Sequence, residues 1–475
     1  MTFKAITMTL QSSVQLRLKT NLLIRSGEGG EFTDSTVEVT PDIQGRRMLH
    51  VNGYVWSSLL RRAISRIDGT GDIVRDIAGD HDDNKRHNDS KAGTTGVSSL
   101  WCEASFVELV TTDTRPGIKI DRQQSSASVG ALYSDEVVPP GYVLTLNFNY
   151  FCADNDRCEQ IKKLLPGALW VINEGIENIG GGWSYGYGKV EVVCARCRVL
   201  DLRVRDDRGL LWRFEEPGTI NYSEVSLSRP KLSKGWIRYV VKAAVLRGQL
   251  LAIHMGYPLS GAYKDYIGRD LPDNFVFMRN IVGDGGFSPQ YVIPGKAIRQ
   301  ALLSVPIERR LRSRGVDICD TPSEVCTCEV CLDYRKQTRQ KGNSPDCLCL
   351  RCMWFGGTDK GGIISVSDAV VSGAHTVTLK RITLCEHSMQ NMELFSGEYL
   401  TGGDFDFEVM IDNSRPDTCP DTCIDTLMKE IEGLFGDISV GSPPGWYRIG
   451  ATTTCTGQIE IKHLEINKLV KCNTL

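Results

Sequence analysis

The chain has 475 residues and a mass of 52.7 kDa, which corresponds to roughly two to four domains of about 150 residues. Hydrophobic residues make up 41% of the sequence, charged residues make up 24%, and the mean hydropathy is −0.19; these values exclude a disordered or fibrous chain. The formal net charge of −3 excludes a chain-wide positive field, so a polyanion would have to be bound by local basic patches.

The sequence predicts a soluble protein of the cytoplasm. Residues 1–13 lack the basic start and the apolar core of a secretory signal. The longest uncharged stretch, residues 137–153, contains Pro139, Pro140 and Gly141, so we expect no membrane segment. The seventeen cysteines are unevenly spread. In a reducing compartment clustered thiols bind metal more often than they form disulfides, so we expect no disulfide scaffold.

The first half of the chain reads as an α+β domain dominated by strands. Alternating or apolar runs predict its strands, and amphipathic runs predict two helices. The expected strands are 13–24, 32–39, 106–110, 143–148 and 190–193, the expected helices are 54–67 and 158–176, and 81–99 is an exposed polar loop. A glycine-rich loop at 26–30 follows the first strand.

The second half repeats the order of the first, with a spacing of over two hundred residues that suits a duplicated domain. Each half has a strand, a glycine-bearing loop, an acidic residue, a strand, a turn and a basic helix. The five features after the first strand are, in this order, 27–30, Asp34, 37–39, 52–53 and 57–62 in the first half. In the second half they are 256–261, Asp273, 275–278, 294–295 and 296–299. We therefore predict domains at 1–215 and 236–475 joined by a linker at 216–235, and the second domain is expected to begin with a strand at 236–246. Chance similarity between strand-rich sequences is the alternative.

A cluster of cysteines between residues 319 and 352 predicts a structural zinc site. Two Cys-x-x-Cys pairs can present four thiolates tetrahedrally. The expected ligands are Cys328, Cys331, Cys349 and Cys352, with Cys319, Cys326 and Cys347 in reserve. Unligated thiols or a redox pair are the alternative. Cys194 and Cys197 have no partner pair, and we expect them to be isolated thiols on a strand.

Three segments suggest contacts with phosphates or RNA. Ser57-Ser58 with Arg61-Arg62, and Lys296 with Arg299, place hydroxyl groups and cations near helix starts, which favour anions. Residues 180–189 (GGGWSYGYGK) combine glycines for close backbone approach with aromatic rings that could stack on single-stranded RNA. The alternatives are a solvated helix face for the basic residues and a hairpin with core aromatics for the glycine-rich segment.

Residues 117–122 (GIKIDR), followed by Ser126-Ala127, Gly130, Leu132-Tyr133 and 136–141 (EVVPPG), resemble the signature of the RAMP backbone subunits of type III CRISPR effector complexes. Residues 180–190 resemble the C-terminal motif of that family. The stretch 349–356 (CLRCMWFG) resembles its zinc-binding segment. Because both halves match in order, the chain resembles a tandem fusion of two backbone subunits, as in type III-D variants. The first half lacks the cysteine pairs, and the second departs from the pattern at 380–398 and in its sparse glycine motif.

The resemblance implies two tandem modified RRM (ferredoxin-like) domains with β-hairpin thumbs, the second with a zinc-binding insertion at 319–352. It implies a CRISPR guide RNA, a target RNA and other type III effector subunits as partners. The residues predicted to contact RNA are Ser57, Ser58, Arg61, Arg62, Arg122, Gly181, Gly182, Tyr185, Gly186, Lys189, Lys296 and Arg299.

The resemblance also implies cleavage of guide-paired target RNA with magnesium, at an Asp in the loop after the first strand. Asp34 matches that position, and Asp273 is its counterpart in the repeat. Such a carboxylate can orient hydrated Mg²⁺ or help to accept the proton of the 2′-hydroxyl. The alternatives are an aspartate that only caps a turn, a guide-holding subunit without catalysis, and a metal-independent guide-processing ribonuclease that uses His50.

Overall fold

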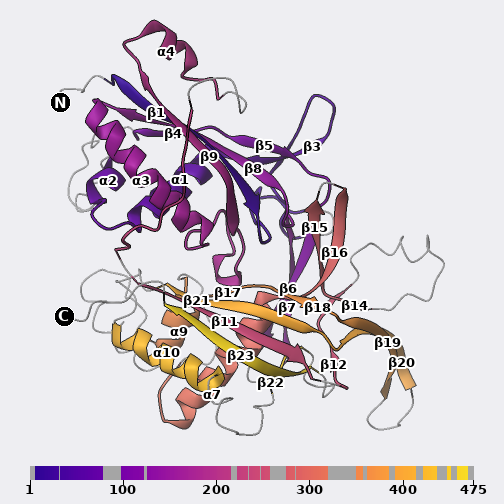
Figure 1. Cartoon of the computed structure of the whole chain (residues 1–475). Coiled ribbons are helices and arrows are strands. Elements are labelled where there is room, and N and C mark those ends of the chain that lie inside the picture. Colours follow the sequence, from indigo (N-terminus) through magenta and orange to yellow (C-terminus); the bar gives the residue numbers. More distant parts are fainter. Residues whose placement is uncertain are drawn as a thin grey trace, which may run out of the picture.

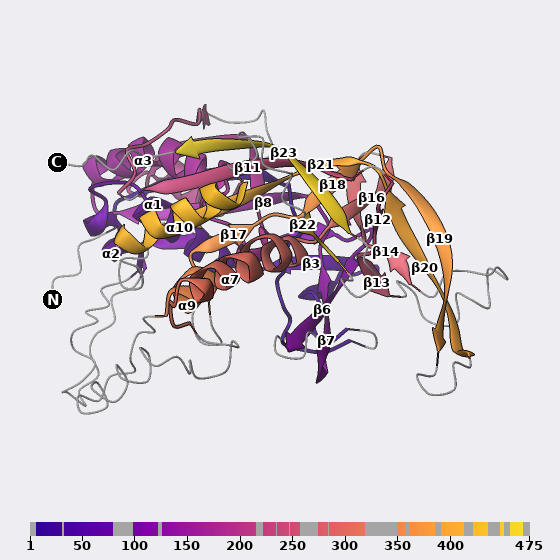
Figure 2. The ribbon, with the colours of Figure 1, turned by 90° about the horizontal axis from the view of Figure 1, so that it is seen from below.

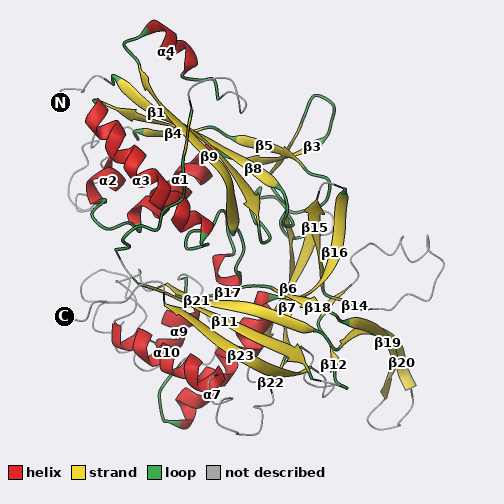
Figure 3. Cartoon of the chain, in the orientation of Figure 1, coloured by secondary structure: helices red, strands yellow, loops and turns green. Residues whose placement is uncertain are grey.

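The computed structural model describes residues 6–468 apart from several internal ranges and positions. Those not described are 31–32, 79–97, 122–125, 215–221, 234, 247, 257–273, 284, 319–348, 357–360, 385–390, 413–420, 436–446 and 451–456, with 1–5 and 469–475 at the ends. The described chain is α+β, and its sheets are antiparallel (Figure 3). The first half of the molecule is residues 6–233, and the second half is residues 235–468.

The first half builds a five-stranded sheet in the order β10-β9-β1-β8-β4, with helices on one face. Helix α1 begins at Asn52, whose side chain accepts a hydrogen bond from the Tyr54 amide, and it buries Trp56 and Leu59 against the sheet. The elements are β1 (Met8–Leu18), β2 (Val39–Pro41), β3 (Arg47–Val51), α1 (Gly53–Ser65), α2 (Gly71–Ala78), β4 (Leu100–Cys102), β5 (Ser105–Glu108), β6 (Asp113–Asp121), β7 (Ser126–Val137), β8 (Val143–Cys152), α3 (Asn155–Asn173), η2 (Trp183–Tyr185), β9 (Val190–Asp201), α4 (Arg205–Leu210) and β10 (Ser223–Glu224).

The second half builds a larger sheet around β11 and has a hydrophobic core of its own, although Trp236 and Met410 pack into the core of the first half. The elements are β11 (Trp236–Val245), β12 (Leu250–Leu251), β13 (His254–Gly256), β14 (Phe275–Val276), β15 (Met278–Gly283), β16 (Gly286–Ile293), α6 (Gly295–Ile298), η3 (Arg299–Ser304), α7 (Val305–Ser313), α9 (Leu350–Phe355), β17 (Ile364–Val366), β18 (Ala369–Ser372), β19 (His375–Leu384), β20 (Asn391–Thr401), β21 (Asp404–Asp412), α10 (Asp421–Phe435), β22 (Tyr447–Arg448) and β23 (Gln458–Lys468).

The central strands of the two halves pair in the same way. Strand β1 lies between β8 and β9, and β11 lies between β21 and β23. Strand β1 has a bulge after Gln15 where it pairs with β9, and β11 has a bulge after Lys242 where it pairs with β23. Each half also has a long antiparallel hairpin, β6–β7 or β19–β20, and Figure 2 shows both hairpins extending to the same side.

The halves are stacked with the helices of the first between the two sheets. Figure 1 shows α1, α2 and α3 on the side of the first sheet that faces the second half, and α7, α9 and α10 on the far side of the second sheet. The polar contacts that join the halves include Arg66 to Asp412 at 2.8 Å, Lys189 to Glu408 at 2.5 Å, and the Asn280 side chain to Asp113 at 2.6 Å. We call this contact region the junction.

Several expected elements are confirmed with changed bounds. The helix expected at 54–67 is α1, the one expected at 158–176 is α3, and the strand expected from Trp236 is β11. The first strand begins at Met8, ahead of the expected start at Ser13, because its polar residues Thr9 and Gln11 are buried in hydrogen bonds. Most of the polar loop expected at 81–99 lies outside the described residues.

The segment expected as a linker contacts the first half closely. Strand β10 pairs with β9, and Leu232 forms a bridge with Ile67.

A disulfide between Cys152 and Cys158 joins the end of β8 to the start of α3, in a chain whose composition predicts no disulfide scaffold. None of the described helices is long and apolar enough to cross a membrane.

Candidate nucleic-acid interface

Asp34 is attached to the hairpin strand β7. Its amide donates to the Ser134 carbonyl at 2.8 Å, and its carboxylate Oδ2 accepts from the Ser134 amide at 2.6 Å and from the Ser134 hydroxyl at 3.2 Å. The side chain is exposed. The structure thus gives Asp34 the turn-capping contact while leaving the carboxylate open to solvent.

The same loop is fixed by two buried carboxylates of β7. Asp135 accepts hydrogen bonds from Ser35 at 2.7 Å and from Arg25 at 3.0 Å. Glu136 accepts from the Val37 amide at 3.0 Å. Burial opposes the charge of Glu136, but hydrogen bonds from Thr112, Val37 and Arg47 prevail and lower its pKa. These contacts hold the loop at the base of the hairpin.

The second half joins its loop to its hairpin by the same two contacts, a parallel bridge and a carboxylate that accepts from a backbone amide. We call this pair of contacts the latch. Asn274 forms a parallel bridge with Gly397, as Ser35 does with Asp135. Glu398 accepts from the Val276 amide at 3.2 Å, as Glu136 does from the Val37 amide. Asp273 itself lies outside the described residues, so the structure describes only its neighbour Asn274.

The glycine-rich segment 180–188 folds into a tight loop around η2. Gly188 has φ +74°, and an added Cβ would lie 1.9 Å from the Ile179 carbonyl oxygen, so a side chain is excluded there. In the second half Gly457 has φ +85° and the same 1.9 Å approach to the Ile449 carbonyl. The sparse motif of the second half therefore keeps the backbone contact of the first.

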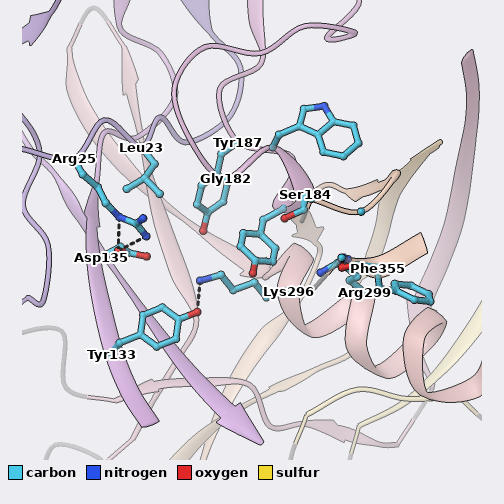
Figure 4. Close-up of a pocket in the computed structure, with 15 residues that line it drawn as sticks. Leu23, Arg25, Tyr133, Asp135, Gly182, Ser184, Tyr187, Lys296, Arg299 and Phe355 are labelled. Atoms are coloured by element: carbon cyan, nitrogen blue, oxygen red, sulfur yellow. Dashed lines mark hydrogen bonds and ion pairs between the residues drawn. The ribbon is translucent and has the colours of Figure 1, made fainter. Parts of the chain in front are cut away.

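A cavity of about 470 Å³ opens where this loop meets the second half (Figure 4). The first half contributes the loop, Arg25 and the β7 side chains Tyr133 and Asp135. The second half contributes Lys296 of α6 and, beyond it, Arg299 and Phe355. We call this cavity the junction pocket. Its lining also includes Leu23, Gly182, Trp183, Ser184, Tyr185, Tyr187, Gly356, Gly361 and Gly362.

Cations and aromatic rings interleave in the junction pocket. The Lys296 ammonium lies 4.8 Å from the centre of the Tyr133 ring and 4.7 Å from that of Tyr185, and it donates to the Tyr133 hydroxyl at 3.1 Å. Burial lowers the pKa of Lys296, opposed by Tyr185 and Asp135. Burial also raises the pKa of Tyr133. Arg299 lies over the rings of Tyr185 and Phe355.

Of the residues predicted to bind RNA, Gly182, Tyr185, Lys296 and Arg299 line this pocket together. Gly181 precedes them, with its amide bound to the Leu23 carbonyl. Gly186 lies at the junction itself, where an added Cβ would be 2.7 Å from the Ser367 Cα. Asp34 is not in the lining, but its partner Ser134 lies between Tyr133 and Asp135, which are.

Other predicted residues are used elsewhere. Lys189 is buried in its ion pair with Glu408, and burial lowers its pKa, opposed by Glu408. Arg62 donates to Glu177 and so holds α1 to the turn after α3, and the Ser58 hydroxyl accepts from the same guanidinium within α1. Ser57 donates to the Tyr54 carbonyl. Arg61 is exposed on α1, and Arg122 lies outside the described residues.

Only half of the expected zinc site falls in the described chain. Cys349 and Cys352 are buried at the start of α9, and their Cys-x-x-Cys spacing is one found in zinc sites. Cys328 and Cys331 lie outside the described residues, as do Cys319, Cys326 and Cys347. Within the residues that the structure describes, no three His, Cys, Asp or Glu side chains form a metal-binding group.

Sequence reasoning missed Arg25, Asp135 and Phe355 as pocket residues, whereas Trp183 belongs to the glycine-rich segment expected to stack on RNA. Arg25 and Asp135 are 110 positions apart and meet only through the loop on β7. The sequence indicates Phe355 only as part of the zinc segment, yet its carbonyl accepts from Arg299 and its ring lies 5.5 Å from that guanidinium. No local spacing signals such contacts.

A comparison with family models finds one match within the first half. Residues 16–191 match the RAMP superfamily. The match runs from the end of β1 through α1, α2, the hairpin and α3 to the start of β9, and so includes Asp34 and the glycine-rich loop. RAMP proteins generally bind CRISPR RNA within Cas complexes. No curated protein matches the chain.

Proposed function

We propose that this protein is a guide-RNA-binding backbone subunit of a type III CRISPR effector complex, built from two ferredoxin-like RAMP units in tandem. The RAMP match supports the first unit. For the second, the support is the shared strand pairing, the shared bulge and the shared latch of Glu136 and Glu398. In each unit the first strand lies between two later strands, β1 between β8 and β9 and β11 between β21 and β23.

The junction pocket is the observation that carries the RNA-binding proposal. Three cations (Arg25, Lys296 and Arg299) line the pocket together with the rings of Tyr133 and Tyr185, and single-stranded RNA is bound through phosphate charge and base stacking. The near-neutral net charge is compatible with this arrangement, because a local group of cations can bind phosphate without a positive field over the whole chain. We therefore place part of the guide strand across the junction.

RNA binding is tested by replacing Lys296. The Lys296→Gln variant should bind single-stranded guide RNA more weakly, and its log–log salt slope should be smaller by about 0.7, the value for one lost phosphate contact. Lys231→Gln is the matched control, since Lys231 is exposed and paired with Asp68 away from the pocket. An unchanged affinity and salt slope for Lys296→Gln would show that the pocket does not hold the strand.

We further propose that Asp34 takes part in cleaving guide-paired target RNA, with Asp273 in the same role in the second unit. The exposed Asp34 carboxylate could orient a hydrated magnesium ion, whose charge would offset that of the scissile phosphate. Complexes assembled with Asp34→Ala or Asp273→Ala should each lose specific cuts and retain target binding. If both variants leave every cut intact, the catalytic assignment is wrong.

The turn-capping contact of Asp34 favours a second candidate, a guide-holding subunit without catalysis. This candidate predicts target binding without cleavage in any divalent cation. A guide-processing role for His50 has less support, since its ring is stacked on Phe106 and paired with Glu38 at 3.0 Å. Loss of guide processing in His50→Ala, with resistance to chelators, would favour that third candidate.

The zinc proposal is tested by metal content. We propose that Cys328, Cys331, Cys349 and Cys352 bind one structural zinc ion. The Cys349→Ser, Cys352→Ser double variant should lose the bound zinc measured by elemental analysis, whereas Cys194→Ser should keep it. Equal zinc content in the two variants would contradict this ligand set.

A further inference from the structure

The outer face of the first sheet is covered by a segment of the chain itself. Residues 205–213, which we call the strap, comprise α4 and the three residues after it. The side chain of Gln11 donates to the Leu210 and Leu211 carbonyls at 3.2 and 2.8 Å, and that of Asn149 donates to the Leu211 carbonyl at 3.0 Å. Both amides are fully buried, so the contact is a packed one.

Two further contacts fix the strap. Arg198 donates to the Arg213 carbonyl at 3.0 Å and to the Gln11 side chain at 2.8 Å. Trp212 meets Trp101 edge to face, with ring centres 4.8 Å apart. Figure 1 shows α4 on the side of the first sheet away from the second half.

The duplicated fold identifies what this face corresponds to. In the first sheet Gln11, Asn149 and Trp101 stand side by side on β1, β8 and β4. In the second sheet Arg238, Met410 and Ser365 stand side by side on β11, β21 and β17. This row corresponds to the first, because Arg238 lies four residues before the bulge of β11 and Gln11 lies four residues before the bulge of β1. The row in the second sheet faces the first half, since the Ser365 hydroxyl donates to the Trp183 carbonyl at 2.6 Å and Met410 packs into the core of the first half.

The same row is therefore covered in both halves, but by different parts of the chain. In the second half it is covered by a unit with the RAMP-type fold. In the first half it is covered by the strap. We propose that the strap is an intramolecular cap that closes a docking face for a second copy of this chain. The inference rests on the tandem part of the proposed function.

The second copy would dock through the far side of its second half, where α7 and α10 lie, as the helix side of the first half docks within one chain. Such a head-to-tail contact does not close on itself, so it would build an open row of chains. The cap would stop this growth at the first half.

The test is the association state of a strap-free protein. Replacing residues 205–213 by a Gly-Ser segment of equal length should convert a monomeric chain into one whose mass in sedimentation velocity rises with concentration to a dimer or more. Adding Trp101→Arg should restore the monomer. Adding Ile43→Arg should not, because Ile43 is exposed at the β2–β3 turn.

Three results would overturn the proposal: a folded strap-free monomer, a wild-type chain that associates equally, or association that survives Trp101→Arg. If the strap-free chain does not fold, the Trp212→Gly variant is measured in its place, because this change leaves the sheet intact. Its mass should also rise with concentration, by less than that of the strap-free chain, and a mass that does not rise would overturn the proposal. Guide-RNA affinity, measured on the same proteins, separates the two proposals. The affinity for guide RNA should be the same with and without the strap. A wild-type chain that does not bind guide RNA would contradict the proposed function and not the strap proposal.

Discussion

At the scale of single residues, Asp34 combines a structural contact and a charge, and two substitutions separate them. Asn keeps an oxygen that can accept from the Ser134 amide, whereas Ala removes it. We expect Asp34→Ala to lower the free energy of unfolding by about 1 kcal/mol and Asp34→Asn to lower it much less. Both variants should lose cleavage at the cut assigned to the first half.

Thermal unfolding and cleavage of guide-paired RNA, measured on the same preparations, check this prediction. Full cleavage by Asp34→Asn would mean that the hydrogen bond, and not the charge, is what matters. The sequence could indicate Asp34, Tyr185, Lys296 and Arg299 because each belongs to a local motif. It could not indicate that Lys189 is used in the junction, since its partner Glu408 lies 219 positions away.

At the scale of elements, the glycine-rich loop depends on one close approach. Gly186 has φ +73°, and an added Cβ would lie 2.7 Å from the Ser367 backbone, so Gly186→Ala must displace the loop from the second half. Gly45 is the control, since its φ is +77° but nothing lies within 4 Å of an added Cβ. Gly45→Ala should cost about 1 kcal/mol of unfolding free energy for backbone strain alone.

We expect Gly186→Ala to cost more than Gly45→Ala in denaturant unfolding and also to weaken guide-RNA binding, because Tyr185 precedes it in the pocket wall. Equal costs and equal RNA affinities would show that the close contact is not needed. Sequence periodicity found α1, α3 and β11 because their apolar residues repeat regularly. It misplaced the start of β1, since the polar residues there are buried by chain segments some 140 to 200 positions away.

At the scale of the whole molecule, the junction ion pairs join the halves. Burial raises the pKa of Glu408, but the charges of Lys189 and Arg238 prevail and lower it from 4.5 to about 2. A lowered carboxyl pKa contributes stability above pH 4.5 that is lost as the pH falls toward 2. The contribution is about 3 kcal/mol at most.

The difference in unfolding free energy between wild type and Glu408→Gln should therefore shrink as the pH falls through that window. Glu191→Gln is the control, because its ion pair with Arg17 is open to solvent and should change stability by under about 1 kcal/mol at any pH. A difference between wild type and Glu408→Gln that does not vary with pH would contradict this account of the junction.

The path of the RNA across both halves can be measured directly by photo-crosslinking of bound single-stranded guide RNA, followed by mass spectrometry of the crosslinked peptides. We predict crosslinks in the peptides that carry Tyr133, Trp183 and Tyr185 of the first half and Phe355 of the second half, and fewer of them in the Lys296→Gln protein. Crosslinks that are confined to one half would contradict the proposal that the two halves hold one strand at their junction. Crosslinks that Lys296→Gln leaves unchanged would contradict it as well.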